Sequence, residues 1–144
     1  MDRQSRARGE GMDRPQAMGS AAFDPAGAAA GVIDLGQIAQ LRELGGEDEP
    51  ELVLDLIELF LSDAHQRLAE MRLALMTQDH RTIARTAHTL KSSAGSMGAV
   101  LLSQVCKEIE ELARNCAGSE LNSRAESCFE AYEKTEQALK LLDE

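Results

Sequence analysis

The sequence predicts an all-α protein, an antiparallel four-helix bundle with a short additional N-terminal helix. Three observations support this fold class. From Val32 onward, apolar residues recur at helical spacing, and no segment shows convincing strand alternation. Short breaks divide this pattern into separate pieces. The chain has three phenylalanines, one tyrosine and no tryptophan among 144 residues. That composition suits one helical core better than a sandwich or a barrel.

The first two helices follow from the pattern after residue 32. A short helix is expected at about 34–44, with Asp34 as its N-cap and the glycine pair 45–46 closing it. The second is expected to open at the segment "EDEP", with Pro50 near its first turn, and to run to about Gln78. Its single apolar stripe predicts one buried face, made of Val53, Leu56, Phe60, Ala64, Leu68, Met71 and Leu75.

Three more long helices are expected. The third starts at Asp79 and includes His88, and the fourth spans about 99–116. The segment "AGSELN", residues 117–122, is expected to break the chain before the fifth helix. Four long amphipathic helices with short connections pack as an antiparallel bundle, and the short first helix is expected to cap one end.

Residues 1–32 are expected to form a flexible N-terminal tail, and residues 33–144 the bundle domain. The tail holds five of the eleven glycines and two of the three prolines. Its four basic residues balance its four acidic ones, so the net charge of −10 belongs to the bundle. The initiating Met1, the tail and the acidic end "LLDE" favour a free-standing protein.

Charge and cysteine usage narrow the class of function. A net charge of −10 argues against nucleic acid or an anionic membrane surface as a partner. No secretory signal and no apolar run of membrane-spanning length are evident, so the protein is expected in the cytoplasm. The three cysteines, at 106, 116 and 128, signal neither a disulfide framework nor a zinc site, and buried thiols are expected.

His88 is the candidate functional residue, because the third helix places it on a basic face. The buried face is formed by Ile83, Ala87, Leu90, Ala94, Met97 and Leu101. His88 projects about 140° away from it. Arg81, Arg85, Ser92, Gly95 and Ala99 are expected on the same outward side, with Lys91 one turn from His88. From residue 79 to 98 there are three basic residues and one acidic residue, so the local charge opposes that of the domain.

The neighbours of His88 decide between kinds of chemistry. No acid lies three or four residues from His88 to orient it as a catalytic base, and no further ligand stands at metal-binding spacing. A di-metal helical bundle is therefore disfavoured, and no metal site is expected. Phosphoryl transfer requires less, because a neutral imidazole is itself a nucleophile near neutral pH and Lys91 could neutralise the phosphoryl charge. His65 and His80 are expected to be ordinary solvated histidines.

Two glycines follow His88 along the same helix. In one interpretation, Gly95 and Gly98 simply end the helix and permit the turn into the fourth helix. Gly95 projects outward and, with Ser92 and Ala99, could keep the surface low enough for another protein to reach the imidazole.

The segment "HTLKSSAGSMGA", residues 88–99, resembles the motif H-x-x-K-G-[SA]-[SA]-x-x-x-G-[AL] of the histidine-containing phosphotransfer (HPt) family of bacterial multistep phosphorelays. The resemblance covers about 33–142, including "ELFLSDAHQRLAEMRLAL" and "LLSQVCKEIEELAR". It implies that His88 carries the phosphoryl group on a ring nitrogen, that Lys91 helps to hold it, and that Gly98 serves close packing. Ser92 replaces the usual glycine after the lysine. Its hydroxyl could hydrogen-bond phosphoryl oxygens or crowd the partner.

The leading hypothesis is therefore a phosphocarrier without catalytic activity of its own. His88 would accept phosphate from a receiver-domain aspartyl-phosphate and pass it to another receiver aspartate. The expected partners are response-regulator receiver domains and a hybrid histidine kinase, with Mg²⁺ supplied by the receiver and no cofactor held by this chain. No P-loop or ATP lid is present, so self-phosphorylation is not expected. A monomer is expected. The alternatives are a docking bundle that binds a signalling partner without phosphate and a module cut from a hybrid sensor kinase.

Overall fold

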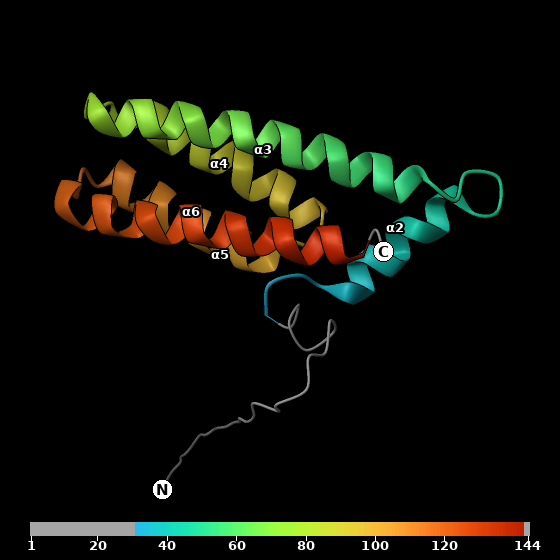
Figure 1. Cartoon of the computed structure of the whole chain (residues 1–144). Helices are drawn as coiled ribbons and strands as arrows, with labels where there is room; N and C mark the ends of the chain where they lie inside the picture. The colour runs from blue at the N-terminus through green and yellow to red at the C-terminus, as the bar shows by residue number, and fades with distance from the viewer. Residues whose placement is uncertain (1–30, 143–144) are drawn as a thin grey trace, which may run out of the picture.

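The computed structural model describes residues 31–142, and these residues form helices and turns without a strand. In chain order the helices are α2 (Leu35–Gly45), α3 (Leu52–Met76), α4 (His80–Ser96), α5 (Val100–Arg114) and α6 (Gly118–Leu141). The four longer helices lie alongside one another as an antiparallel bundle (Figure 1). The all-α prediction is confirmed. The tail expected at 1–32 falls, up to residue 30, outside the described residues.

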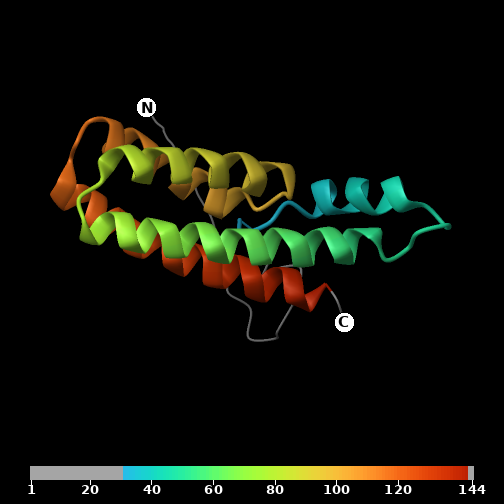
Figure 2. The same ribbon diagram turned by 90° about the horizontal axis from the view of Figure 1, so that it is seen from above.

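The long helices differ in length, and α2 occupies the space that this difference leaves. The helices α4 and α5 have 17 and 15 residues, whereas α3 and α6 have 25 and 24. Helix α4, which packs on α3, therefore covers only part of it, and α2 lies beside the N-terminal part of α3 (Figure 2). Asp34 caps α2 as expected, since its side chain accepts a hydrogen bond from the Gln37 amide at 3.2 Å.

The three connections within the bundle, residues 77–79, 97–99 and 115–117, share one backbone design. The middle residue of each adopts a left-handed conformation: Gln78 (φ 58°), Gly98 (φ 80°) and Cys116 (φ 54°). The amide of the third residue then donates to a carbonyl five positions back, at 2.8–3.0 Å. This is the Schellman arrangement that closes a helix. Each turn delivers the chain directly into the next helix.

The break expected at residues 117–122 is wrong in extent. The helix α6 already begins at Gly118, and Leu121 within it is buried. Cys116 takes the left-handed position that glycine usually occupies, so the turn is completed earlier than the glycine in the sequence suggested. Cys116 is also exposed in this turn, which corrects the expectation of three buried thiols.

The other two cysteines lie in the core, between α5 and α6. Cys106 and Cys128 are both fully buried, and their sulfur atoms lie 3.9 Å apart as free thiols. The contact with Cys128, together with burial, raises the pKa of the Cys106 thiol far above its usual range. Tyr132 of α6 extends across the bundle, where its hydroxyl donates to the Leu61 carbonyl of α3 at 3.2 Å.

The start of α2 is joined to the turn that follows α4. The Asp34 amide donates to the Gly98 carbonyl at 2.7 Å, and the Gln37 side chain donates to the Ser96 carbonyl at 3.0 Å. A β-carbon on Gly98 would lie 3.1 Å from Gln37 Cβ and 3.2 Å from the Asp34 carbonyl oxygen. Gly98 therefore lies in the turn that ends α4, as one interpretation expected, and it also permits close packing, as the family resemblance implied. Among the described helices, none is both long and apolar enough to cross a membrane.

Candidate functional site

Helix α4 divides into a buried and an exposed face, as its periodicity predicted. Ile83, Ala87, Leu90 and Ala94 are buried. The opposite face exposes Arg81, Arg85, His88, Ser92 and Gly95. The helix begins after Asp79, whose carboxylate accepts from the amide and the hydroxyl of Thr82 at 3.1 and 2.7 Å. These hydrogen bonds lower the pKa of Asp79, and the charges of the two arginines lower it further.

Ala99 does not belong to the exposed face, and its assignment to a docking surface is corrected. Helix α4 ends at Ser96, so the helical projection no longer applies three residues later. Ala99 is completely buried and serves as the N-cap residue of α5. The exposed residue at this point of the chain is Val100. Gly95, by contrast, is exposed, and a β-carbon there would meet only the Ser103 hydroxyl oxygen, at 3.6 Å.

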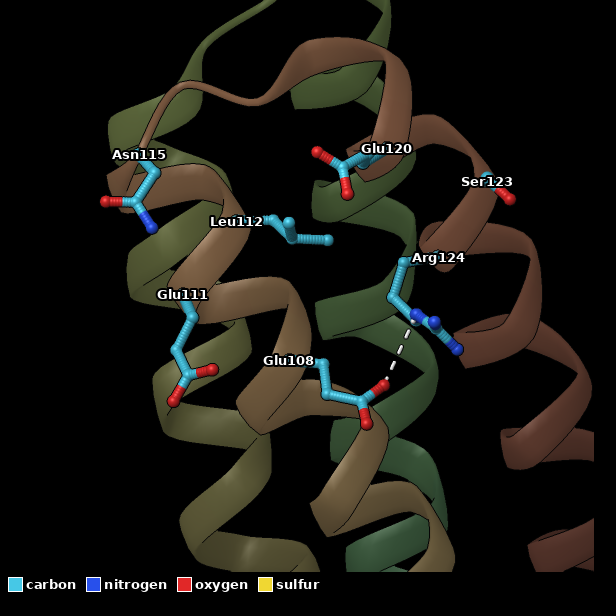
Figure 3. Close-up of a pocket in the computed structure, with 7 residues that line it drawn as sticks. All are labelled: Glu108, Glu111, Leu112, Asn115, Glu120, Ser123 and Arg124. Carbon is cyan, nitrogen blue, oxygen red and sulfur yellow. Dashed lines mark ion pairs between the residues drawn. The ribbon is translucent and has the colours of Figure 1, made fainter.

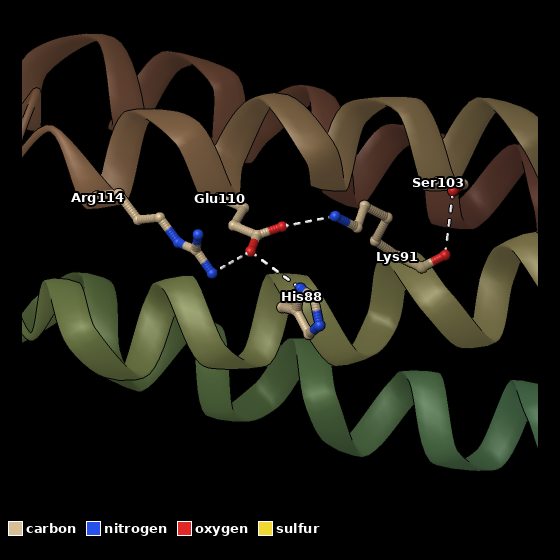
Figure 4. Close-up of polar contacts among 5 residues, drawn as sticks. All are labelled: His88, Lys91, Ser103, Glu110 and Arg114. Carbon is tan, nitrogen blue, oxygen red and sulfur yellow. Dashed lines mark hydrogen bonds and ion pairs between the residues drawn. The ribbon is translucent and has the colours of Figure 1, made fainter.

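His88 has a carboxylate partner that its own helix does not supply. Glu110 of α5 places Oε2 at 2.9 Å from the Nδ1 atom of His88 (Figure 4). The histidine side chain is 55% exposed, whereas that of the glutamate is only 7% exposed. The buried acid therefore holds one edge of a ring that otherwise faces solvent. No acid lies within one turn of His88 on α4, but α5 supplies the carboxylate partner.

Glu110 also receives two cations. Lys91 Nζ lies 2.9 Å from Oε1, and the Arg114 guanidinium contacts Oε2. Figure 4 shows the carboxylate between these two side chains, with His88 below it. Lys91 lies one turn from His88 as expected, but its ammonium reaches Glu110. Its carbonyl accepts a hydrogen bond from the Ser103 hydroxyl of α5 at 3.0 Å.

The pKa of Glu110 reflects two opposing effects. Burial raises it, because a carboxylate loses solvation in the bundle. The hydrogen bonds from Lys91 and His88, together with the charges of Lys91 and Arg114, lower it by more. The net pKa lies below the usual value, so Glu110 is ionised near neutral pH. An ionised carboxylate accepts hydrogen bonds and cannot donate them.

A basic groove opens beside His88. It has a volume of about 520 Å³ and is lined by His80, Arg81, Ala84, Arg85, His88, Ala113, Arg114 and Cys116. Three arginines and no acidic residue face it, so it suits an anionic group. Arg114 comes from α5 and was not anticipated from the sequence, because it lies 26 positions after the histidine it adjoins.

A second hollow has the opposite character. It lies between α5 and α6, has a volume of about 490 Å³, and is lined by three glutamates, at 108, 111 and 120 (Figure 3). The single cation there, Arg124, is paired with Glu108 at 3.3 Å. An anionic group would be repelled from this hollow. Within residues 31–142, no three His, Cys, Asp or Glu side chains are grouped so that they could hold a metal ion.

The fold and the site together define a helical bundle that presents His88, held by Glu110, on a basic surface. The chain belongs to the Hpt domain family, whose sequence model matches residues 55–144. It is 31% identical to histidine-containing phosphotransfer protein B of Pseudomonas aeruginosa PAO1, with a TM-score of 0.71 over 78% of this chain and 94% of that one. Maize ZmHP2 has the same fold, with a TM-score of 0.71 and 21% identity over 81% of this chain and 93% of that one.

Curated relatives match over shorter segments. The sensor protein TorS of Escherichia coli is 33% identical over 79 residues, which are 55% of this chain and 8% of TorS. Histidine-containing phosphotransfer protein 1 of Arabidopsis thaliana is 32% identical over 78 residues, 53% of this chain and 50% of that protein. The matches thus span half or less of these relatives.

Proposed function

We propose that this chain is a histidine phosphocarrier of a multistep phosphorelay and that His88 is its phosphoryl acceptor. The observation that carries the proposal is an exposed imidazole, held at one edge by Glu110 and bordered by a basic groove. Membership of the Hpt family supports the same role. His65 lies beside the Tyr132 ring and does not line this groove. His80, at the start of α4, lines the groove with His88, but among the described residues His88 is the only histidine held by a carboxylate.

The proposed step joins His88 to a receiver aspartate. A ring nitrogen attacks the phosphorus of an aspartyl-phosphate, the nitrogen–phosphorus bond forms, and the acyl oxygen–phosphorus bond breaks with its electron pair going to the leaving carboxylate. The reverse step passes the phosphoryl group to a second aspartate. Lys91 and Ser92 are proposed to contact the phosphoryl oxygens, because both follow His88 on the same helix and carry donors. Catalysis is expected from the receiver and its Mg²⁺, and no cofactor is proposed for this chain.

The partners are proposed from charge and shape. Arg81 and Arg85 would face the acidic pocket of a receiver, while Ser92 and Gly95 would let it approach closely. A hybrid histidine kinase would supply the phosphate through its receiver, and a response regulator would take it. We propose that the protein works as a cytoplasmic monomer that neither binds ATP nor phosphorylates itself.

Incubation with a panel of phosphorylated receiver domains tests this function. Acid-labile phosphate should appear on the intact chain and should be lost in His88→Gln. The variants His65→Gln and His80→Gln serve as matched controls and should be labelled normally. If no receiver labels the wild-type chain, or if label persists in His88→Gln, the proposed carrier role or its site is wrong.

A further inference from the structure

We propose that Cys106 and Cys128 are a latent redox pair, which a hydroperoxide converts into a disulfide that joins α5 to α6 and stabilises the bundle. Both thiols are free, and both are buried. The proposed carrier function uses neither of them, so the inference is independent of that function. The modification acts on the stability of the bundle and not on the chemistry of the His88 imidazole.

The placement of the two sulfur atoms carries the proposal. Cys106 projects from the buried face of α5 and Cys128 from the buried face of α6, and their Sγ atoms lie 3.9 Å apart. A disulfide bond is about 2.05 Å long, so the sulfur atoms need to approach each other by about 1.9 Å. The bond therefore requires only a small adjustment of two side chains and the helices that carry them.

The residues around Cys128 allow this approach. On the same buried face of α6, Ala125 lies one turn before Cys128 and Ala131 lies one turn after it. The distance between two packed helices depends on the size of the side chains at their contact. Alanine occupies little of that space, so α6 can move towards α5 at this point without displacing a large side chain.

Burial determines when the two thiols can react. The contact with Cys128, together with burial, raises the pKa of the Cys106 thiol far above its usual range, so little reactive thiolate forms while the bundle is closed. Both side chains have zero exposure to solvent. An oxidant therefore reaches either sulfur only when the bundle opens transiently. The exposed Cys116 has no such protection.

The reaction with a hydroperoxide balances without a further reagent. One cysteine sulfur attacks a peroxide oxygen, the oxygen–oxygen bond breaks, and a sulfenic acid forms with release of water or an alcohol. The second cysteine sulfur then attacks the sulfenic sulfur. The sulfur–sulfur bond forms, and the hydroxyl group leaves as water with the proton of the second thiol. The two sulfurs together lose two electrons, which the peroxide gains.

The disulfide should stabilise the fold because it restricts the unfolded chain. It closes a loop between residues 22 positions apart, and it joins the middle of α5 to the middle of α6. A cross-link of this kind reduces the conformational entropy of the unfolded state. For a domain of this size, we expect the melting temperature to rise by about 5–15 °C.

The test uses the full chain with Cys116→Ser, in which Cys106 and Cys128 are the only remaining thiols. Incubation with hydrogen peroxide, without denaturant, should remove the mass of two hydrogen atoms. Trypsin should then release residues 92–107 joined to residues 125–134, and dithiothreitol should separate the two peptides. Thermal melting followed by circular dichroism, before and after oxidation, measures the change in stability.

Two chains with a single thiol are matched controls. Adding Cys106→Ser or Cys128→Ser to Cys116→Ser leaves one buried thiol, so peroxide should neither form an internal disulfide nor raise the melting temperature. Each chain is compared with its own reduced form, so a loss of stability caused by the serine itself does not affect the result. Cys106 and Cys128 thiols that stay reduced, that oxidise separately to sulfinic acids, or that pair without raising the melting temperature would overturn the inference.

Discussion

Lys91 and Glu110 are paired across the α4–α5 interface, with Nζ and Oε1 2.9 Å apart. The Lys91 ammonium, which was expected to hold the phosphoryl group, is therefore already paired with Glu110 in the unphosphorylated chain. Its side chain remains 30% exposed, so it can reach an incoming anion by exchanging one charged partner for another. Because Lys91 gives up its contact with Glu110, this exchange stabilises the phosphoryl group less than a new contact from an unpaired lysine would.

Removal of Lys91 should consequently slow transfer without abolishing it. Lys91→Ala is expected to reduce the rate of phosphotransfer from a receiver by about one to two orders of magnitude, because one charge-assisted hydrogen bond to the phosphoryl group is lost. Rapid-mixing measurement of label transfer gives the rate. Lys107→Ala removes an exposed lysine from α5 as the control. Equal rates for both variants would exclude Lys91 from the site.

Gly95 should be critical for docking but not for folding. Because it is exposed and a β-carbon would meet only Ser103, Gly95→Arg should leave cooperative unfolding close to that of wild type, or stabilise it by up to about 1 kcal/mol. The long side chain should nevertheless block a receiver and severely reduce transfer. Gly95→Ala is the matched control and should transfer normally. Normal transfer by the arginine variant would mean that partners dock elsewhere, whereas a collapsed thermal melt would identify Gly95 as a packing residue.

Gly98 should show the opposite behaviour. Its left-handed backbone and the close approach of Gln37 leave no room for a side chain. Gly98→Ala is therefore expected to destabilise the fold by more than about 1 kcal/mol. Urea unfolding monitored by circular dichroism measures this. An unchanged urea midpoint would show that the start of α2 can move away from residue 98 without loss of stability, and would contradict the prediction.

The third turn offers a stabilising change at the equivalent position. Cys116 holds a left-handed conformation (φ 54°) that is unfavourable for a residue with a β-carbon. Cys116→Gly should therefore raise the free energy of unfolding by about 0.5–1 kcal/mol, net of the entropy that glycine gains in the unfolded chain. Cys116→Ser is the control that removes the thiol and keeps the strain. If serine and glycine have the same effect, backbone strain is not the cause.

Acid should weaken the bundle partly through Glu110. Its folded pKa lies below the ordinary value of 4.5, so its ionised form stabilises the fold above that value. This contribution is lost as the pH falls through the lower, folded value. Between about pH 7 and about pH 3, the unfolding free energy of wild type should fall more than that of Glu110→Gln. Glu111→Gln is the control, and a wild-type slope matched by Glu110→Gln would contradict the prediction.

The helical order and the exposed face of α4 could be predicted because both depend on local periodicity. The apolar residues of α4 repeat every three or four positions, which fixes the direction in which His88 projects. The prediction that Ala99 lies on the exposed face was wrong because it extended the helical projection past Ser96, where α4 ends. The turn at Cys116 was not predicted, because a residue other than glycine in the left-handed conformation cannot be recognised from the sequence.

Glu110 could not be paired with His88 from the sequence, because the pairing depends on the register between α4 and α5. One signal was nevertheless present. Cys106 and Ala113 are buried in α5, and Glu110 lies four residues after the first and three before the second. An acid within a buried helical row needs partners. That signal indicates a buried carboxylate, but only the packed helices identify which histidine it contacts.

All the site groups lie on two consecutive helices that pack along most of their length, joined by the turn at 97–99. His88 and Glu110 are 22 residues apart, a short loop to close. Contacts of such small sequence separation form readily in folding, before the distant contact of α3 with α6 is required. We therefore expect the reactive geometry to arise in the early-forming half of the bundle. Substitutions in α3 or α6 should shorten the lifetime of the native state well before they alter what the imidazole faces.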